Sequence, residues 1–211
     1  MTPLAAQGAR GWLQPWADRT ARWSVIALGF SIPVSTALDS ALTLLLLVAW
    51  LAAGRYRYKY DALRANPVAL AAIALWLLYA VGVLWAGDTG GNAGAYLGKY
   101  SKLLLLPVVA TLPTDPRDRE RALIAFAAGL LLTLALSYAL WLGLLTPGRP
   151  FTGDAANPTV FKKHITQNVL IAFGVLLLSL FAWRAGSRWV RLVWTGLALL
   201  ALLPETVRER L

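Results

Sequence analysis

The sequence predicts an all-α protein, a polytopic transmembrane helix bundle with about six membrane segments. Apolar residues make up 58% of the chain and charged residues only 14%, whereas a soluble domain usually carries about a quarter charged residues. The mean hydropathy is +0.60, and ten tryptophans fit a chain adapted to a lipid–water boundary. We therefore expect an integral membrane protein with the lipid bilayer as a partner.

Several chemistries are excluded or disfavoured by composition. The chain has no cysteine, which excludes disulfides, thiolate chemistry and cysteine metal sites. One histidine and ten Asp/Glu residues leave little for a metal site, and no cofactor is expected. The net charge of +10 is what cytoplasmic loops rich in Lys and Arg produce in a membrane protein, so no nucleic-acid partner is expected.

The first element is a polar segment, residues 1–22, with three arginines (Arg10, Arg19 and Arg22). We expect it to be cytoplasmic and to precede a transmembrane helical domain over residues 23–203. A secretory signal peptide over Met1–Ala37 is the alternative, with a basic flank, a short apolar core and small residues at its end. The long segment before the apolar core, which includes Trp12, favours the transmembrane reading.

Two short apolar runs follow, residues 24–38 and 41–54, each below the about 20 residues that a helix needs to cross a bilayer. They form either a hairpin that turns at Asp39 or one long helix kinked at Pro33. Because arginines flank the pair on both sides, the hairpin keeps both flanks in the cytoplasm and is favoured. Asp39 is then expected to be a turn residue and the N-cap of a helix from Ala41.

The later apolar runs predict the remaining helices, at residues 68–85, 96–112, 122–145, 165–183 and 192–203. Alternation of loop charge places loops 54–66, 113–121 and 184–191 inside and loops 86–95 and 146–160 outside. Four small residues in the fifth run predict close helix packing: Ala125, Ala127, Ala128 and Gly129. A polar tail over residues 204–211 begins at Pro204.

Two lysines interrupt the fourth run. Lys102 lies about 15 Å from the expected helix end near Pro113, using a rise of about 1.5 Å per residue. A lysine near the bilayer centre costs about 3 kcal/mol, so Lys102 is expected to face a protein interior or an aqueous cavity. Lys99 and Tyr96 share its helix face, and Pro107 is expected to bend the helix. The alternative is a short helix whose lysines extend to the outer headgroups.

The stretch FKKHITQ opens the sixth run at the expected external boundary. Lys163, His164 and Gln167 share one helix face there, and Arg149 of the preceding loop could join them. Lysine supplies charge to a phosphate, histidine exchanges a proton and amides orient sugar hydroxyls, so the pattern suits an anionic ligand with a lipid tail. The alternative is an interfacial basic cluster that only anchors the helix.

The order of these features resembles the amino-terminal half of the O-antigen ligase family. The segments that carry the resemblance are FSIPVSTALDSALTLLLLVAWLAAG, the NP of the basic loop, LGKYSKLLLLPVVATLPTDPRDRERALIAFAAG and FKKHITQNVLIAFG. The resemblance implies a protein of the bacterial inner (cytoplasmic) membrane that transfers a glycan from undecaprenyl pyrophosphate to lipid A–core at the periplasmic face. It implies carrier contacts for Lys99 and Lys102, and for Lys163, His164 and Gln167.

The chain departs from that family after its last apolar run. The family carries a large periplasmic loop with catalytic residues in its second half, whereas this sequence ends at Leu211. We therefore expect an incomplete ligase without its catalytic loop, or one completed by a second chain, and assign no catalytic residue. Two other functions stay open: a small transporter or flippase-like protein for an anionic lipid or solute, and a non-catalytic membrane assembly protein.

Overall fold

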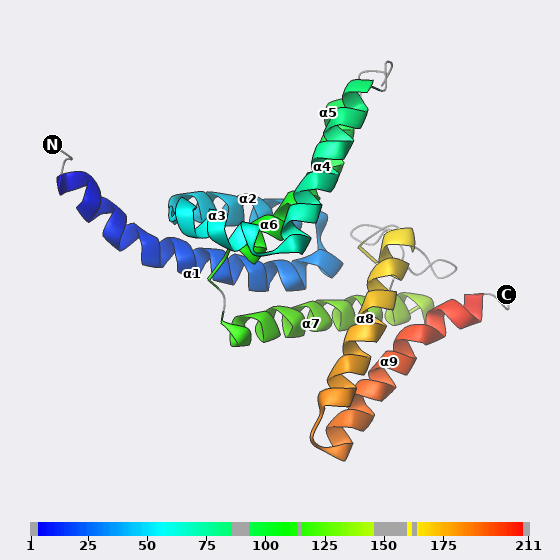
Figure 1. Ribbon diagram of the computed structural model, residues 1–211. Coiled ribbons are helices and arrows are strands. Elements are labelled where there is room, and N and C mark those ends of the chain that lie inside the picture. Colours follow the sequence, from blue (N-terminus) through cyan, green and yellow to red (C-terminus); the bar gives the residue numbers. More distant parts are fainter. Residues whose placement is uncertain (1–3, 86–92, 114, 146–159, 162–163, 209–211) are drawn as a thin grey trace. The chain divides into compact units, whose positions relative to one another are not determined.

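The computed structural model describes residues 4–85, 93–113, 115–145, 160–161 and 164–208, and every regular element in these ranges is a helix (Figure 1). In chain order the elements are α1 (Leu4–Val34), α2 (Thr36–Ala52), α3 (Tyr56–Arg64), α4 (Pro67–Trp85), α5 (Ala93–Tyr100), the 3₁₀ helix η1 (Ser101–Leu104), α6 (Leu105–Ala110), α7 (Pro116–Trp141), α8 (His164–Arg184) and α9 (Arg188–Arg208). The all-α prediction is confirmed for this part of the chain.

The chain divides into two compact units. The first unit comprises residues 1–25 and 42–115, and the second comprises residues 26–41 and 116–211. Each unit is described by itself below. Helix α1 runs unbroken across position 22 and α9 continues past Pro204, so helix ends do not coincide with the segment boundaries expected from the sequence.

Two helices are long and apolar enough to cross a bilayer, α7 with 26 residues and the Thr166–Arg184 stretch of α8 with 19. Helices α2 and α3 pass the same test only as a pair, with a bend of 112° between them. The apolar helices at Pro67–Val83 and Ser101–Ala110 are shorter. The described residues therefore hold two candidate spans, or three if the bent pair is one, which indicates a multi-pass membrane protein. The larger number of about six membrane segments stays a prediction.

The first two apolar runs form two separate helices, α1 and α2, and the break between them is at Ser35 and not at Asp39. The Ser35 hydroxyl accepts a hydrogen bond of 3.3 Å from the backbone N–H of Leu38, the position that an N-cap side chain bonds. Pro33 removes a backbone donor just before this point and favours the end of α1. The prediction that Asp39 is the N-cap is therefore wrong, because Ser35 takes that role and Asp39 lies inside the first turn of α2.

The single helix expected over residues 96–112 is also wrong, since the chain there forms α5, η1 and α6 in succession. Pro107 gives the physical reason. It has no N–H to donate to the carbonyl four residues earlier, at Leu103, and an α-helix tolerates proline best in its first turn. The chain accordingly tightens into the 3₁₀ helix η1 and restarts as α6 at Leu105, with Pro107 near the new helix start.

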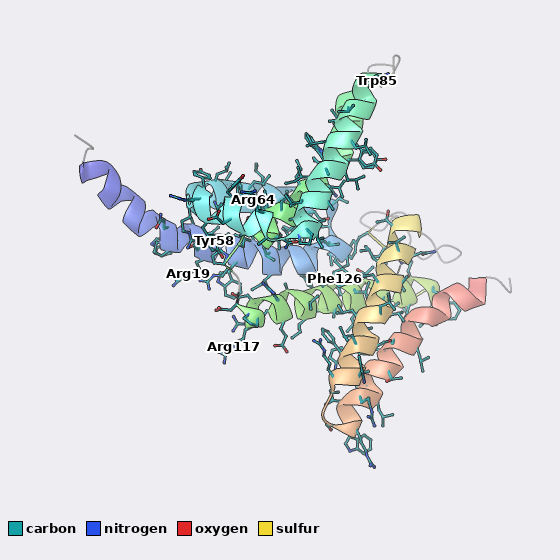
Figure 2. All side chains as sticks on the ribbon, in the orientation of Figure 1. Arg19, Tyr58, Arg64, Trp85, Arg117 and Phe126 are labelled. Atoms are coloured by element: carbon teal, nitrogen blue, oxygen red, sulfur yellow. The ribbon has the colours of Figure 1, made fainter. Side chains whose placement is uncertain are left out.

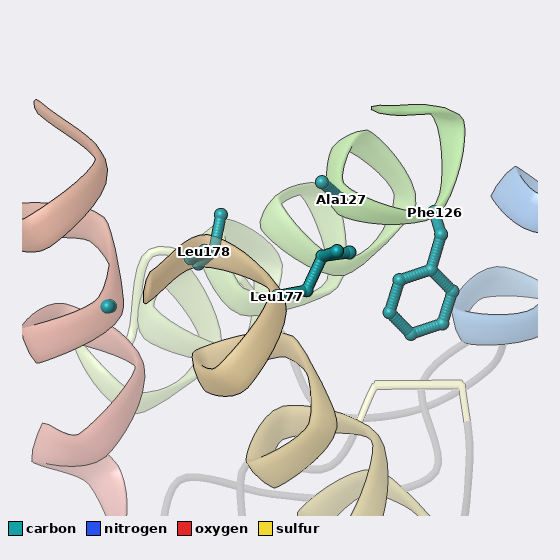
Figure 3. Packing of buried hydrophobic residues seen from close by; sticks show 5 residues of the cluster. Phe126, Ala127, Leu177 and Leu178 are labelled. Atoms are coloured by element: carbon teal, nitrogen blue, oxygen red, sulfur yellow. The ribbon is translucent and has the colours of Figure 1, made fainter. Parts of the chain in front are cut away.

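The core of the second unit lies among α7, α8 and α9. Figure 3 shows its central cluster of five buried residues, which are Phe126, Ala127, Leu177, Leu178 and Ala198. The adjoining cluster joins Leu130 and Leu134 of α7 to Ile171 of α8. These apolar contacts hold the two candidate spans side by side.

Glycines let helices of the second unit approach at backbone distance. A Cβ added at Gly129 would lie 2.5 Å from the Phe30 carbonyl oxygen, and one added at Gly29 would lie 2.4 Å from that of Ala122. Close packing was expected for this part of α7, and Gly129 and Ala127 confirm it. Ala128, by contrast, is exposed.

Candidate functional site

The predicted cations of the fourth apolar run belong to the first unit. Lys99 lies in α5, and Lys102 lies in η1 with its side chain exposed. The Ser101 hydroxyl donates a hydrogen bond of 2.7 Å to the carbonyl oxygen of Gly98, which stabilises the chain where α5 gives way to the 3₁₀ turn. Lys102 is therefore presented at a break between two helices and is not enclosed within the first unit.

The predicted residues around FKKHITQ belong to the second unit. His164 is the first residue of α8, whereas Arg149 and Lys163 lie outside the described residues. Lys99 and Lys102 are in the other unit. A single pocket built from all of these residues stays a prediction.

Gln167 is the best-defined member of the predicted set. Its side chain is 6% exposed. Its Oε1 accepts a hydrogen bond of 3.2 Å from the backbone N–H of Val160, and its Nε2 donates one of 3.4 Å to the hydroxyl of Ser137 on α7. Gln167 thus links the chain segment just before α8 to the neighbouring candidate span α7 and fixes where that segment runs.

A buried carboxylate lies at the turn between α1 and α2, within the second unit. Asp39 is 7% exposed and Ser31 is fully buried. The Ser31 hydroxyl donates a hydrogen bond of 2.5 Å to Oδ1 of Asp39, which lies in the first turn of α2. Nearby in the same unit, the Thr133 hydroxyl donates to the carbonyl oxygens of Gly129, at 3.0 Å, and of Pro33, at 3.4 Å.

Sequence reasoning missed the Ser31–Asp39 pair as a site because Asp39 was assigned to a solvent-exposed turn. One signal in the sequence pointed to it. Asp39 is the one acidic residue between Asp18 and Asp61, in the middle of two apolar runs. A carboxylate in such a setting usually faces a protein interior and has a function.

The first unit also contains a buried lysine that the sequence placed in a basic loop. Lys59 of α3 is 6% exposed, and its ammonium donates to the carbonyl oxygen of Trp50 at the end of α2. It lies 4.1 Å from the centre of the Trp50 ring and 5.1 Å from that of Tyr56. This cation is therefore used to join two helices.

The features together define the class: a helical, multi-pass membrane protein with buried polar ties at helix breaks. Neither a family model, nor a curated protein, nor a solved structure matches the chain.

Proposed function

We propose that this chain is a membrane protein of the O-antigen ligase type, which binds an undecaprenyl-pyrophosphate-linked glycan for transfer to lipid A–core. The proposal follows the resemblance of its apolar and basic segments. A ligand of this kind needs two things from a protein: cations for a pyrophosphate and an apolar surface for a polyisoprenoid chain.

The observation that carries the proposal is the placement of Lys102 beside α4 in the first unit. Helices α5, η1 and α6 all pack against α4, and the rings of Tyr79 and Tyr100 stack at 4.2 Å. Helix α4 leaves large apolar side chains exposed, among them Leu77 at 51% and Leu78 at 67%. An exposed cation and an exposed apolar helix face therefore occur in one compact unit.

The second unit supports the proposal through Gln167. Its side-chain oxygen accepts a hydrogen bond from the backbone N–H of Val160, and this fixes the chain at Val160 relative to α8. In this proposal Lys163 adds charge for the pyrophosphate and His164 exchanges a proton or donates a hydrogen bond. Arg149 and Lys99 complete the set of proposed carrier contacts.

The test is binding of undecaprenyl pyrophosphate to the purified chain in detergent. Removing a charge-assisted contact should weaken binding by about 10- to 100-fold, so Lys102→Ala is expected to show this loss. Arg117→Ala is the matched control, since Arg117 is an exposed cation of the second unit. Equal affinity of Lys102→Ala and the unaltered chain would overturn the assignment of Lys102.

Transfer itself is tested separately, by complementation of a ligase-deficient strain. The chain would be expressed alone and joined to the carboxyl-terminal half of a known O-antigen ligase, with the lipopolysaccharide ladder as the readout. A ladder that depends on Lys102 supports the ligase assignment. Carrier binding without any ladder in either form would separate binding from transfer and contradict the enzyme assignment.

A second function, as a small transporter or flippase-like protein, is favoured by the Ser31–Asp39 pair. Transporters place ionisable groups at breaks in membrane helices, and Asp39 lies buried four residues after the break at Ser35. Proteoliposomes carrying a fluorescent short-chain anionic phospholipid would test it by dithionite accessibility. Lipid movement that is lost in Asp39→Asn would favour this function over the ligase.

A further inference from the structure

Helix α3 is short, basic and rich in tyrosine, and both of its ends are fixed. The chain turns through Gly54 and Arg55, whose φ angles are 63° and 50°, and bends by 112° between α2 and α3. After α3, the Asn66 side chain accepts hydrogen bonds from the N–H groups of Val68 (3.1 Å) and Ala69 (3.2 Å), which caps α4. Helix α3 is thus held at both ends, and its axis is steeply inclined to that of α2.

The inner side of α3 is fastened to the first unit. Lys59 donates to the Trp50 carbonyl, as described above, and α3 packs against α4 and α6. Arg55, just before the helix, forms an ion pair of 2.5 Å with Asp18 of α1. These contacts determine which side of α3 faces away from the other helices of the first unit.

The outward side of α3 combines cations with aromatic rings. Arg57 and Arg64 are exposed on it, together with one acid, Asp61. Three exposed tyrosines flank these charges: Tyr56 at 60%, Tyr58 at 51% and Tyr60 at 57%. The Arg64 guanidinium lies 5.5 Å from the Tyr60 ring centre, and Figure 2 shows Tyr58 and Arg64 on this helix.

The helices before and after α3, α2 and α4, both expose large apolar side chains. Helix α2 exposes Leu44 at 64% and Val48 at 55%, and α4 exposes Val68 at 64% and Leu78 at 67%. Surfaces of this kind suit lipid tails. Tyrosines and arginines concentrate where tails give way to headgroups, so a basic, tyrosine-rich helix between two such apolar helices fits the headgroup layer.

We propose that α3 is an interfacial helix that binds the phosphates of anionic membrane lipids through Arg57 and Arg64. Charge complementarity selects this partner, since guanidinium groups match phosphate oxygens in geometry and charge. The exposed rings of Tyr58 and Tyr60 then lie at the headgroup level, whereas the Tyr56 hydroxyl donates a hydrogen bond of 3.0 Å to the Leu51 carbonyl oxygen. Asp61 repels the same phosphates and moderates the attraction.

The absence of cysteine from the chain allows a direct test with a single introduced thiol. Ala65→Cys puts a fluorophore on an exposed position directly after α3. The full chain is placed in nanodiscs of mixed phosphatidylcholine and phosphatidylglycerol. One or the other lipid carries a nitroxide near the glycerol end of its acyl chain, and the ratio of the two quenching efficiencies measures the local preference for the anionic lipid.

The unaltered helix is expected to prefer phosphatidylglycerol, and three variants give directional expectations. The double variant Arg57→Gln/Arg64→Gln should lower the preference for phosphatidylglycerol by about fivefold for each arginine removed. A basic residue near an anionic surface contributes about a fivefold factor in affinity. Arg57→Lys with Arg64→Lys keeps the charge and should largely retain the preference. Asp61→Asn removes the acid from the same face and should raise it.

Equal quenching by the two lipids in the unaltered chain would overturn the proposal. A double glutamine variant that keeps its preference, or a lower preference in Asp61→Asn, would also overturn it. Because the lysine and asparagine variants must bind lipid to meet expectation, misfolding cannot imitate the full pattern. The assignment does not depend on carrier binding by Lys102, so the two proposals can fail separately.

Discussion

The hydroxyl of Ser31 donates a hydrogen bond of 2.5 Å to the carboxylate of Asp39, and the two residues lie four positions before and four positions after the turn at Ser35. Both are buried in the second unit. The pair therefore joins the end of α1 to the start of α2 with a charged hydrogen bond. Such a bond in a buried setting contributes more than a neutral one exposed to solvent.

Ser31→Ala is expected to destabilise the protein by about 1.5–3 kcal/mol, because it leaves a buried carboxylate without its hydroxyl donor. Thermal unfolding in detergent, followed by helical circular dichroism, would measure the change. Ser40→Ala is the control, since the Ser40 hydroxyl is exposed and donates only to the Thr36 carbonyl of its own helix. Equal effects of the two substitutions would contradict a structural role for the pair.

Gly129→Ala is expected to cost about 1–3 kcal/mol, because the added methyl group would meet the Phe30 backbone and force the two segments apart. Gly196→Ala is the matched control in α9, where an added Cβ meets open space. Alanine is a better helix former than glycine, so that change should be neutral or stabilising by up to about 1 kcal/mol. A lower unfolding temperature for Gly129→Ala together with an equal or higher one for Gly196→Ala would confirm the close approach at Gly129.

The sequence predicted the helical class and most helix positions because apolar composition and length are local properties. The runs at residues 68–85 and 165–183 appear as α4 and α8 within one or two residues. Helix breaks were predicted less well. The turn was assigned to Asp39 because aspartate is a good capping residue, whereas in the structure Ser35 caps α2 and Asp39 is buried against Ser31.

The surroundings of the predicted site residues could not be derived from the sequence. Spacing along a helix placed Gln167 in a polar cluster, yet its partners Val160 and Ser137 depend on how separate segments pack. The same limit applies to Lys59, which is indistinguishable in sequence from the exposed Arg57 two residues away. Tertiary contacts, which a single sequence does not display, separate a structural lysine from a lipid-binding arginine.

Gln167→Ala is expected to destabilise the second unit by about 1–3 kcal/mol, since it leaves the buried Val160 N–H without its acceptor. Hydrogen exchange by mass spectrometry should show faster exchange in the peptide that contains Val160. Asn168→Ala is the control on the next residue of α8, which is only half-buried. Unchanged exchange in Gln167→Ala would contradict the proposed tie.

Lys59→Ala is expected to lower stability more than Asp18→Asn, although the second substitution removes an ion pair. Exposed ion pairs contribute about 0–1 kcal/mol, and Arg55 of that pair has 38% of its side chain exposed. Lys59 is buried, donates to the Trp50 carbonyl and faces two aromatic rings, so its loss should cost about 1–3 kcal/mol. Unfolding temperatures of the two variants in one detergent would establish the order, and a larger loss in Asp18→Asn would show that α3 is held mainly by the Arg55–Asp18 pair.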